Sequence, residues 1–181
     1  HLQGVVEPLT DIIDEFSLRD PVNLNGESYL ATMYVYPAMV WYRTDLFEEP
    51  PTTWETLLSE ANRISDETDM DGYAVPSGQP PNAQSHVQQL LWHNNVDIWS
   101  GTSSDHSITI NQGENQELAV EAFQWIQDLG EYSPEASGWG WGETMDALRL
   151  ENVAAIPSIG GLPPAYLLGN DSPLVDNIAP A

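Results

Sequence analysis

The sequence predicts an α/β fold, because short strand-like runs alternate with amphipathic helical segments along the chain. Residues 54–64 and 116–129 carry apolar side chains at the 3.6-residue period of a helix packed on one face. Residues 153–156 form a fully apolar run, as expected for a strand covered on both faces. With 181 residues, 41% of them hydrophobic, the chain can close the core of one ordinary domain.

The first part of the chain holds small elements that need a partner to bury their apolar side chains. Thr10 is positioned to cap a short helix over residues 11–16. Asn25-Gly26 is a turn signal, and a strand rich in aromatic and β-branched residues is expected over 29–35.

The next passage predicts a strand followed by a helix with a clear start. Pro37 cannot donate a hydrogen bond to a sheet, so it should interrupt pairing before a strand over residues 39–42. Thr52 and Glu55 form a capping box behind a proline pair, and the periodic apolar residues that follow indicate a packed helix.

The remaining elements continue the alternation. Strands are expected over residues 73–75, 107–110 and 153–156 and from 176 onward, and helices over 83–94, 116–129, 143–150 and up to 168. In the helix over 116–129, the side chains expected to point inward are those of Leu118, Ala122, Phe123, Trp125, Ile126 and Leu129, with Gly130 as the C-terminal cap.

Charge is the most unusual property of the composition. There are 28 acidic residues against four arginines and no lysine, which gives a formal net charge of −24. Such a surface repels phosphate backbones and anionic lipids, which argues against binding to nucleic acid or to membrane surfaces. Because the acids are spread through periodic segments, we interpret the chain as a folded protein adapted to high salt, from a halophilic microbe.

Composition also excludes several kinds of site. The absence of cysteine excludes disulfides, thiolate zinc sites and cysteine nucleophiles. The absence of lysine excludes a phosphate-loop lysine and Schiff-base catalysis, and no Gly-x-Ser-x-Gly nucleophile motif occurs. No apolar run approaches the ~20 residues of a membrane span, so no membrane insertion is expected from this sequence.

Two patterns resemble metal sites without completing them. Residues 67–72 carry acids at alternate positions like the start of a calcium loop, but Gly78 stands where a bidentate glutamate is required. His86 and His93 share a helix face without a third ligand in register, so we interpret them as a surface pair. We therefore expect no metal and no cofactor.

Five passages, taken in order, resemble motifs of one protein family. They are residues 4–11 (GVVEPLTD), 29–47, 50–57 (PPTTWETL), 69–73 (DMDGY) and 150–161. Together they resemble the family 1 extracellular solute-binding proteins, the sugar-capturing subunits of ABC importers. The last passage departs from the family pattern, with Asn152-Val153 in place of a usual Gly-Lys and Ile156 in place of a usual Met. In addition, Gly161-Leu162 lies where many members carry a ligand-stacking tryptophan.

The resemblance implies a type II periplasmic-binding-protein-like lobe. Residues 1–36 would be a remnant of the first lobe and the lead-in to the crossing strand, and residues 37–181 a C-terminally incomplete second lobe. Because family members are longer than this chain, we interpret it as a fragment of an extracellular protein, anchored to the membrane through a missing N-terminal segment. Its partners would be a sugar and the permease subunits of an ABC transporter.

Sugar capture needs flat apolar faces for sugar rings, and a composition of 7 Trp and 7 Tyr against 3 Phe favours such surfaces. Trp139 and Trp141 lie in a glycine-rich segment and are candidates for ligand stacking, whereas Trp54 and Trp125 sit on apolar helix faces and are interpreted as core. Tyr36 is expected to face the interlobe cleft, while Trp41 packs inside. The full set of expected ligand-binding residues is Tyr36, Pro37, Gln79, Asn82, Trp99, Trp139, Trp141, Gly160 and Gly161.

The predicted function is therefore non-catalytic capture of a sugar or oligosaccharide for import. Two alternatives stay open. One is a fragment of a glycoside hydrolase that uses a pair of carboxylates, because 28 acidic residues make suitable pairs common by chance. The other is an interaction domain whose aromatic residues all belong to the core.

Overall fold

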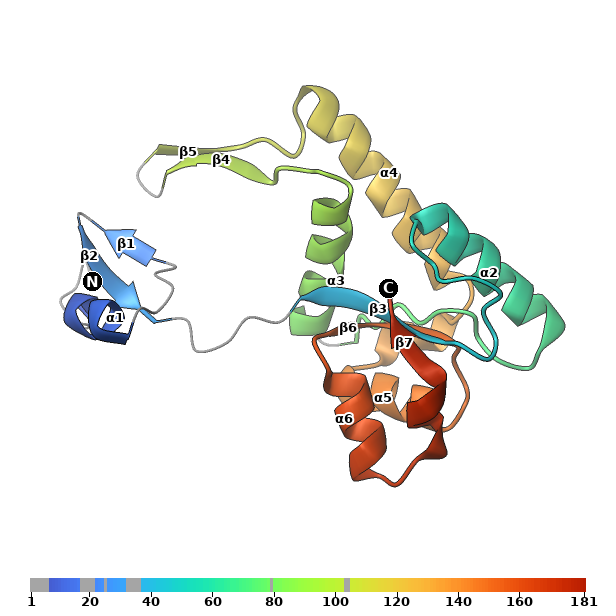
Figure 1. Ribbon diagram of the computed structural model, residues 1–181. Helices are drawn as coiled ribbons and strands as arrows, with labels where there is room; N and C mark the ends of the chain where they lie inside the picture. Colours follow the sequence, from blue (N-terminus) through green and yellow to red (C-terminus); the bar gives the residue numbers. More distant parts are fainter. Residues whose placement is uncertain (1–6, 17–21, 25, 32–36, 79, 103–104) are drawn as a thin grey trace. The chain divides into compact units, whose positions relative to one another are not determined.

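The computed structural model describes residues 7–16, 22–24, 26–31, 37–78, 80–102 and 105–181 (Figure 1). The chain divides into two compact units, residues 1–37 and residues 38–181. The first unit contains α1 (Thr10–Phe16), β1 (Val22–Leu24) and β2 (Glu27–Leu30). The second contains β3 (Ala38–Arg43), α2 (Trp54–Glu67), α3 (Pro80–His93), β4 (Trp99–Thr102), β5 (Asp105–Ile108), α4 (Gly113–Gly130), η1 (Pro134–Gly138), α5 (Trp141–Arg149), β6 (Ala155–Ile159), α6 (Leu162–Gly169), η2 (Pro173–Asn177) and β7 (Ile178–Pro180).

The first unit packs a short helix against a hairpin. β1 and β2 pair antiparallel, and Gly26 between them has φ +85°, a conformation that glycine adopts without a steric cost. Thr10 is the first residue of α1, and its Oγ1 accepts a hydrogen bond from the Ser28 N–H at 3.0 Å. Ile13 and Tyr29 are buried. The predicted strand over 29–35 is described only as far as 31, and residues 32–35 lie outside the described part.

The second unit is built on a three-stranded sheet in the order β6-β3-β7, in which both outer strands run antiparallel to β3. β3 and β6 are in register from Ala38 opposite Ile159 to Tyr42 opposite Ala155. Helices cover both faces of the sheet, with α2, α3 and α4 on one side and α5 and α6 on the other (Figure 1). The predicted α/β fold is confirmed.

Alternation along β3 supplies both halves of the core. Trp41 and Tyr42 are neighbours in sequence and face opposite sides of the sheet, where each joins a separate cluster of buried side chains. The cluster on the side of α5 and α6 includes Met145, Leu148, Val153, Ile156 and Leu167. The cluster on the side of α2 and α4 includes Leu57, Ala61, Ile64, Leu129 and Ala154. β6 is thus covered on both faces, as predicted from the apolar run over 153–156, but the strand begins and ends later than predicted, at Ala155 and Ile159.

A proline lies inside β6, where a missing N–H would normally break the sheet. Pro157 is opposite Val40 of β3. Val40 directs its N–H and its C=O to Ala181 on the other side, at 3.3 and 2.8 Å, so it requires no hydrogen bond from Pro157. The register of the antiparallel pair therefore tolerates the proline.

The start of α2 differs by one residue from the prediction. Thr53, and not Thr52, is the N-cap, and its Oγ1 accepts a hydrogen bond from the Thr56 N–H at 3.1 Å. Glu55 therefore occupies the second helical position instead of the third, and the predicted capping box is wrong. The predicted apolar stripe is correct, since Leu57, Ala61 and Ile64 are buried.

Residues 73–75 are not a strand, although they were predicted to be one. They run beside β6 with a single parallel bridge, between Asp71 and Val153, and the Ala74 N–H donates to the Ala155 C=O at 3.2 Å. Close packing holds this stretch in place, because a Cβ on Gly72 would collide with the backbone of Ala61 in α2. The predicted strand therefore lies beside the sheet, but it forms too few backbone hydrogen bonds with its neighbour to count as a strand.

Two further predictions on helices are corrected. In α4, Phe123 is 47% exposed, because the buried stripe runs through Ala119, Ala122 and Leu129 and leaves its neighbour on the outer face. Gly130 is the last residue of α4, and Glu131 takes the capping position.

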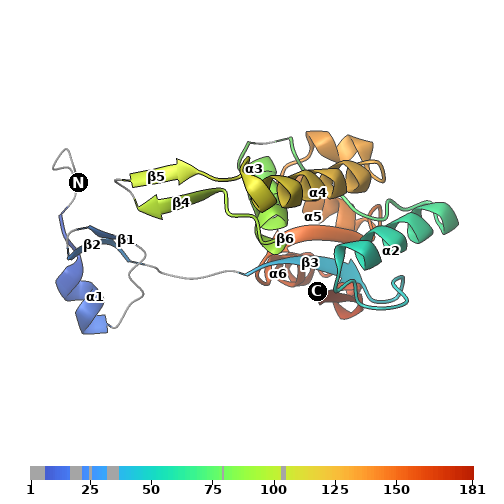
Figure 2. The ribbon, with the colours of Figure 1, turned by 90° about the horizontal axis from the view of Figure 1, so that it is seen from above.

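The structure also has a hairpin that the sequence predicted only in part. β5 covers residues 105–108 and pairs with β4, whereas one strand over 107–110 was expected. The β5 side chains are all exposed, and the hairpin extends away from the sheet and helices in both views (Figures 1 and 2).

Candidate functional site

One edge of the sheet in the second unit gathers the beginnings of three helices. β3 begins and β6 ends at this edge, since Ala38 is opposite Ile159, and α6 begins shortly afterward at Leu162. We call this the helix-start edge and define it by residues 38, 76–78, 80–82, 139–142 and 159–162. In α/β proteins, ligands usually bind beyond the carboxyl ends of strands, where helices start.

α3 and α5 begin at the same edge. The chain runs parallel to β6 from Asp71 onward, so it reaches this edge just before α3 starts at Pro80. There the Gly78 N–H donates to the Trp139 C=O at 2.9 Å, immediately ahead of α5. A Cβ on Gly78 would collide with the backbone of Gly138, so only glycine permits this close approach.

Several of the predicted ligand-binding residues lie at or next to this edge. Trp139, Trp141, Gly160 and Gly161 belong to it, and Pro37 directly precedes β3. Tyr36 and Gln79 lie outside the described residues. For Asn82 the structure describes only the backbone, in the first turn of α3.

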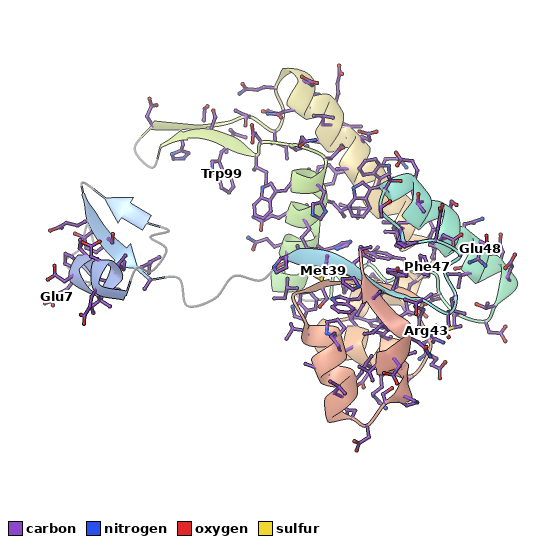
Figure 3. The ribbon with its side chains drawn as sticks, viewed as in Figure 1. Glu7, Met39, Arg43, Phe47, Glu48 and Trp99 are labelled. Carbon is purple, nitrogen blue, oxygen red and sulfur yellow. The ribbon has the colours of Figure 1, made fainter. Side chains whose placement is uncertain are left out.

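Two other tryptophans discussed in the sequence analysis, Trp41 and Trp99, do not expose a side chain at the edge. Trp41 is buried, as predicted, and its Nε1–H donates to the Gly160 C=O at 3.0 Å, which ties β3 to the end of β6. Trp99 is 54% exposed on β4, beyond the far end of α3 (Figure 3). A helix of that length spans about 20 Å, so Trp99 lies apart from the helix-start edge.

The glycine-rich surroundings of Trp139 and Trp141 indicated a loop, and this is correct for one of the two. Trp139 lies in the short connection between the 3₁₀ helix η1 (Pro134–Gly138) and α5, whereas Trp141 is the first residue of α5. Both indoles are half-buried against the core cluster on the side of α5 and α6. Each indole therefore packs against the core with part of its surface and leaves the remaining part exposed at the edge.

The helix-start edge is poor in hydrogen-bond donors for anions. Helix N-termini normally attract anions through free N–H groups, but α3 opens with Pro80-Pro81 and α6 carries Pro163-Pro164 in its first turn. At the start of α5, the Glu143 carboxylate accepts from the Gly140 N–H at 3.0 Å. Two starts thus lack several donors, and the third carries a negative charge.

The arginines that could attract an anion are used elsewhere. The structure describes three of them, and each is in an ion pair. Arg43, at the opposite end of β3, donates to Asp45 through two bonds of 2.7 Å and to Glu151 at 3.1 Å (Figure 3). These bonds hold the pKa of the Asp45 carboxyl below its ordinary value.

His86 and His93 were predicted to form a surface pair, and this prediction is wrong for His86. His86 is 4% exposed, and its ring lies 6.0 Å from that of Tyr73, whereas His93 is exposed. Neither ring nitrogen of His86 has a hydrogen-bond partner, and burial lowers its pKa to about 4. Among the described residues no cluster of three metal-ligating side chains occurs.

A groove between α5 and α6 opens near the helix-start edge, with a volume of about 460 Å³. Its lining residues are Trp141, Gly142, Met145, Leu162, Ala165 and Tyr166. Of these, only Trp141 was a predicted site residue. Leu162 and Tyr166 are four residues apart, as are Trp141 and Met145. Residues at this spacing lie on the same face of a helix, so the sequence could have indicated that each pair lines a common surface.

Comparison with known proteins gives a consistent family match. The model of the bacterial extracellular solute-binding protein family matches residues 2–161. Maltose-bound MalE3 of T. maritima has a TM-score of 0.79 at 18% identity, over 97% of this chain and 47% of its own. An ABC transporter solute-binding protein of Thermotoga lettingae TMO, with bound α-D-tagatose, has a TM-score of 0.79 at 18% identity, over 99% of this chain and 49% of its own.

A third structure agrees with these two. A ribitol complex of an ABC transporter solute-binding protein from Agrobacterium radiobacter K84 has a TM-score of 0.75 at 20% identity. It matches over 99% of this chain and 48% of its own. The chain thus spans about half the length of the structures it matches.

Proposed function

Because this chain belongs to the bacterial extracellular solute-binding proteins, we propose that it captures a neutral sugar or oligosaccharide for ABC-type import, without catalysis. The solved structures that it resembles hold maltose, tagatose and ribitol, which are all uncharged polyhydroxyl compounds. The binding surface that we assign is the helix-start edge.

The observation that carries this proposal is the chemistry of that edge. Two half-buried indoles, Trp139 and Trp141, offer flat apolar faces, which suit the C–H faces of sugar rings. Prolines at two helix starts and Glu143 at the third make the edge unsuited to phosphates and carboxylates. An uncharged ligand that stacks and donates a few directed hydrogen bonds fits this combination.

The wider context of the proposal follows the family. We assign residues 1–36 to a remnant of the first lobe and residues 37–181 to the second, so that Tyr36 and Pro37 border the interlobe cleft, and closure of the lobes would report occupancy. The expected partners are the permease subunits of the importer. The family is extracellular. We propose that a segment preceding this chain anchors the protein to the membrane. None of the helices in the described part is long and apolar enough to cross a membrane.

The acidic composition supports a further part of the proposal, adaptation to high salt. A formal charge of −24 creates self-repulsion that molar salt screens. The melting temperature should therefore rise steeply between millimolar and molar sodium chloride. A melting temperature and circular dichroism spectrum that are constant across this range would contradict salt adaptation and leave sugar binding untouched.

Calorimetry with product analysis tests the proposed function. The protein, expressed from its complete open reading frame, is titrated with maltose, laminaribiose and D-mannitol, and the mixtures are examined for shorter products. We expect binding of at least one compound without turnover, and a weaker affinity in Trp139→Ala but not in Trp92→Ala, an exposed tryptophan on α3. Release of shorter sugars would instead support the glycoside hydrolase. A lowered melting temperature with unchanged affinity in Trp139→Ala would support the interaction domain.

A further inference from the structure

Two carboxylates from distant parts of the chain face each other at the end of β6 that lies away from the helix-start edge. Asp71 is fixed beside the chain that leads into β6, because its N–H donates to the Asn152 C=O at 2.9 Å and its C=O accepts from the Ala154 N–H at 2.8 Å. β6 reaches the helix-start edge only at Ile159, so Asp71 lies at the opposite end. Glu135, in the first turn of η1, is within hydrogen-bonding reach of the Asp71 carboxyl.

The fold brings these two acids together, because the backbone near each of them is held in place. On one side, a Cβ on Gly72 would collide with the backbone of Ala61 in α2, so the chain packs tightly there. On the other side, the Ala136 N–H donates to the Ser133 C=O at 3.0 Å and closes the turn that carries Glu135. The approach of the two carboxylates is therefore a property of the tertiary structure.

Ser133 adds a third oxygen to this pair. Its side chain is 1% exposed, it does not cap η1, and its Oγ has no hydrogen-bond partner within the described part of the chain. The side chain faces the Asp71 carboxyl, since it opposes the increase in the pKa of Asp71 that burial causes. A buried hydroxyl without a partner costs free energy, so its presence beside two carboxylates indicates a ligand there.

No described cation of the protein compensates the two acids. Carboxylates this close repel each other unless a proton or a cation lies between them. The three described arginines, Arg43, Arg63 and Arg149, pair with other acids, and none of the ion pairs among the described residues includes Asp71 or Glu135. The charge of this pair is therefore open to a cation from solution.

Further acids raise the negative potential around the site. Tyr132, next to Ser133 in the sequence, has its pKa raised by burial and by the nearby Asp128, Glu131 and Asp66. These acids come from α4, from the residue after it and from α2. A field of one sign that several segments create in this way concentrates cations at the surface.

We propose that Asp71, Glu135 and Ser133 form a binding site for a calcium ion, with water completing the coordination. Carboxylate and hydroxyl oxygens suit hard cations, and two carboxylates balance the charge of a divalent one. Calcium accepts roughly six to eight oxygens in a flexible arrangement, whereas magnesium requires a nearly ideal octahedron. Ligands from two separate segments, one of them the long side chain of Glu135, fit the more tolerant ion.

This site differs from the incomplete calcium loop of the sequence. Glu67, the first acid of that pattern, is bound to Arg63 at 2.9 Å, and Gly78 at its last position lies at the helix-start edge. Only Asp71 of the pattern belongs to the proposed site. η1 supplies the second carboxylate, Glu135, in place of the glutamate that the loop lacks.

Calorimetry with calcium chloride tests the site. The protein, expressed from its complete open reading frame and freed of metal with a chelator, is titrated in molar sodium chloride, which screens non-specific attraction. We expect calcium to bind, and Asp71→Asn and Glu135→Gln each to weaken the affinity by at least about tenfold. Asp69→Asn is the matched control, because it removes the same charge from an exposed residue of the same turn, and it should bind like the wild type.

Thermal denaturation gives a second readout. Calcium should raise the melting temperature of the wild type and of Asp69→Asn, because it binds the folded state, but not those of Asp71→Asn and Glu135→Gln. In chelator, Asp71→Asn should be at least as stable as the wild type, since it removes one of two repelling charges. Loss of the calcium response is thereby separated from loss of the fold.

Three outcomes would overturn the proposal. Absence of calcium binding to the wild type would show that a proton relieves the repulsion between the two acids. An equal loss of affinity in Asp69→Asn would show that diffuse negative charge attracts the ion. Tighter binding of magnesium chloride than of calcium chloride would contradict the choice of ion. Sugar binding at the helix-start edge is independent of all three, because that edge is at the other end of β6.

Discussion

The two ends of the central strand β3 differ in how they use charge. At its last residue, Arg43 is buried and bound to Asp45 and Glu151, so a cation holds two acids from distant parts of the sequence. At its first residue, Ala38 lies beside Ile159 and the starts of three helices, where prolines and indoles replace charged donors.

The difference shows the role of the few arginines in this chain. The three described arginines each pair with acids, and two of them also connect separate segments: Arg43 reaches Glu151, and Arg63 donates to the Leu46 C=O at 2.6 Å. With 28 acids and four arginines, the cations are used to hold the fold together. This distribution is consistent with an uncharged ligand at the helix-start edge.

The largest expected difference between the two ends of β3 is the pH at which each loses stability as acid is added. His86, on the helix that begins at the helix-start edge, has its pKa lowered to about 4 by burial, below its ordinary value of 6.5. Between these values the unfolded chain binds more protons than the folded one, so stability falls as pH drops from 6.5 toward 4, by about 3 kcal/mol. At the arginine end, hydrogen bonds from Arg43 and Arg63 lower the pKa values of Asp45 and Glu60, so that loss comes at lower pH.

Urea denaturation as a function of pH measures this separation. In His86→Leu the decline between pH 6.5 and 4 should flatten, while the decline at lower pH stays. An equal slope in wild type and variant over that range would show that His86 is not buried as a neutral ring.

Removing Arg43 should give the next largest effect. Arg43→Ala leaves Asp45 and Glu151 close together without their shared cation, and we expect a loss of about 2 kcal/mol, less than for a fully buried pair because both carboxylates contact water. Urea denaturation at neutral pH gives the value, with Arg43→Lys as an intermediate control. A loss below that of Arg63→Ala would contradict the central role of this ion pair.

The cap of α2 offers a smaller and more local comparison. Thr53→Ala should cost about 1 kcal/mol, because the Thr56 N–H loses its acceptor. Thr52→Ala serves as the control and should change stability by less than about 0.5 kcal/mol, since Thr52 is an exposed residue that does not cap the helix. Thermal denaturation measures the two losses of stability. Equal losses, or a larger loss for Thr52→Ala, would support Thr52 as the N-cap, as predicted from the sequence.

The smallest effect is expected at Asp71. Burial raises its pKa, the neighbouring Ser133 side chain opposes this change, and Glu135 adds to it. An acid with a raised pKa in the folded state lowers stability as pH rises past its ordinary value. Asp71→Asn should therefore raise the melting temperature slightly at neutral pH, and this gain should vanish on acidification. A gain that is independent of pH would point to a different cause.

The sequence was informative wherever local pattern decides structure. The period of Leu57, Ala61 and Ile64 defined α2, and the apolar run over 153–156 showed that a strand there is covered on both faces. It was misleading at Trp141, because glycines on both sides indicated a loop although Glu143 binds the Gly140 N–H and α5 begins there.

The helix-start edge itself could be predicted only in part. Trp139, Gly160 and Gly161 were candidates from composition and family resemblance, but that they share an edge depends on tertiary packing. The contact of Gly78 with Gly138 and the bond of Trp41 to Gly160 join residues more than 50 positions apart. The groove depends in the same way on the packing of α5 against α6, which no local pattern encodes.

A paired titration tests the central claim, that the helix-start edge serves an uncharged sugar. The protein is titrated by calorimetry with glucose, maltose and laminaribiose, and with the phosphate ester of whichever sugar binds most tightly. We predict that the neutral sugar binds and that its phosphate ester binds at least about tenfold more weakly, because the edge offers few N–H donors and carries Glu143. Equal or tighter binding of the phosphate ester would contradict the account.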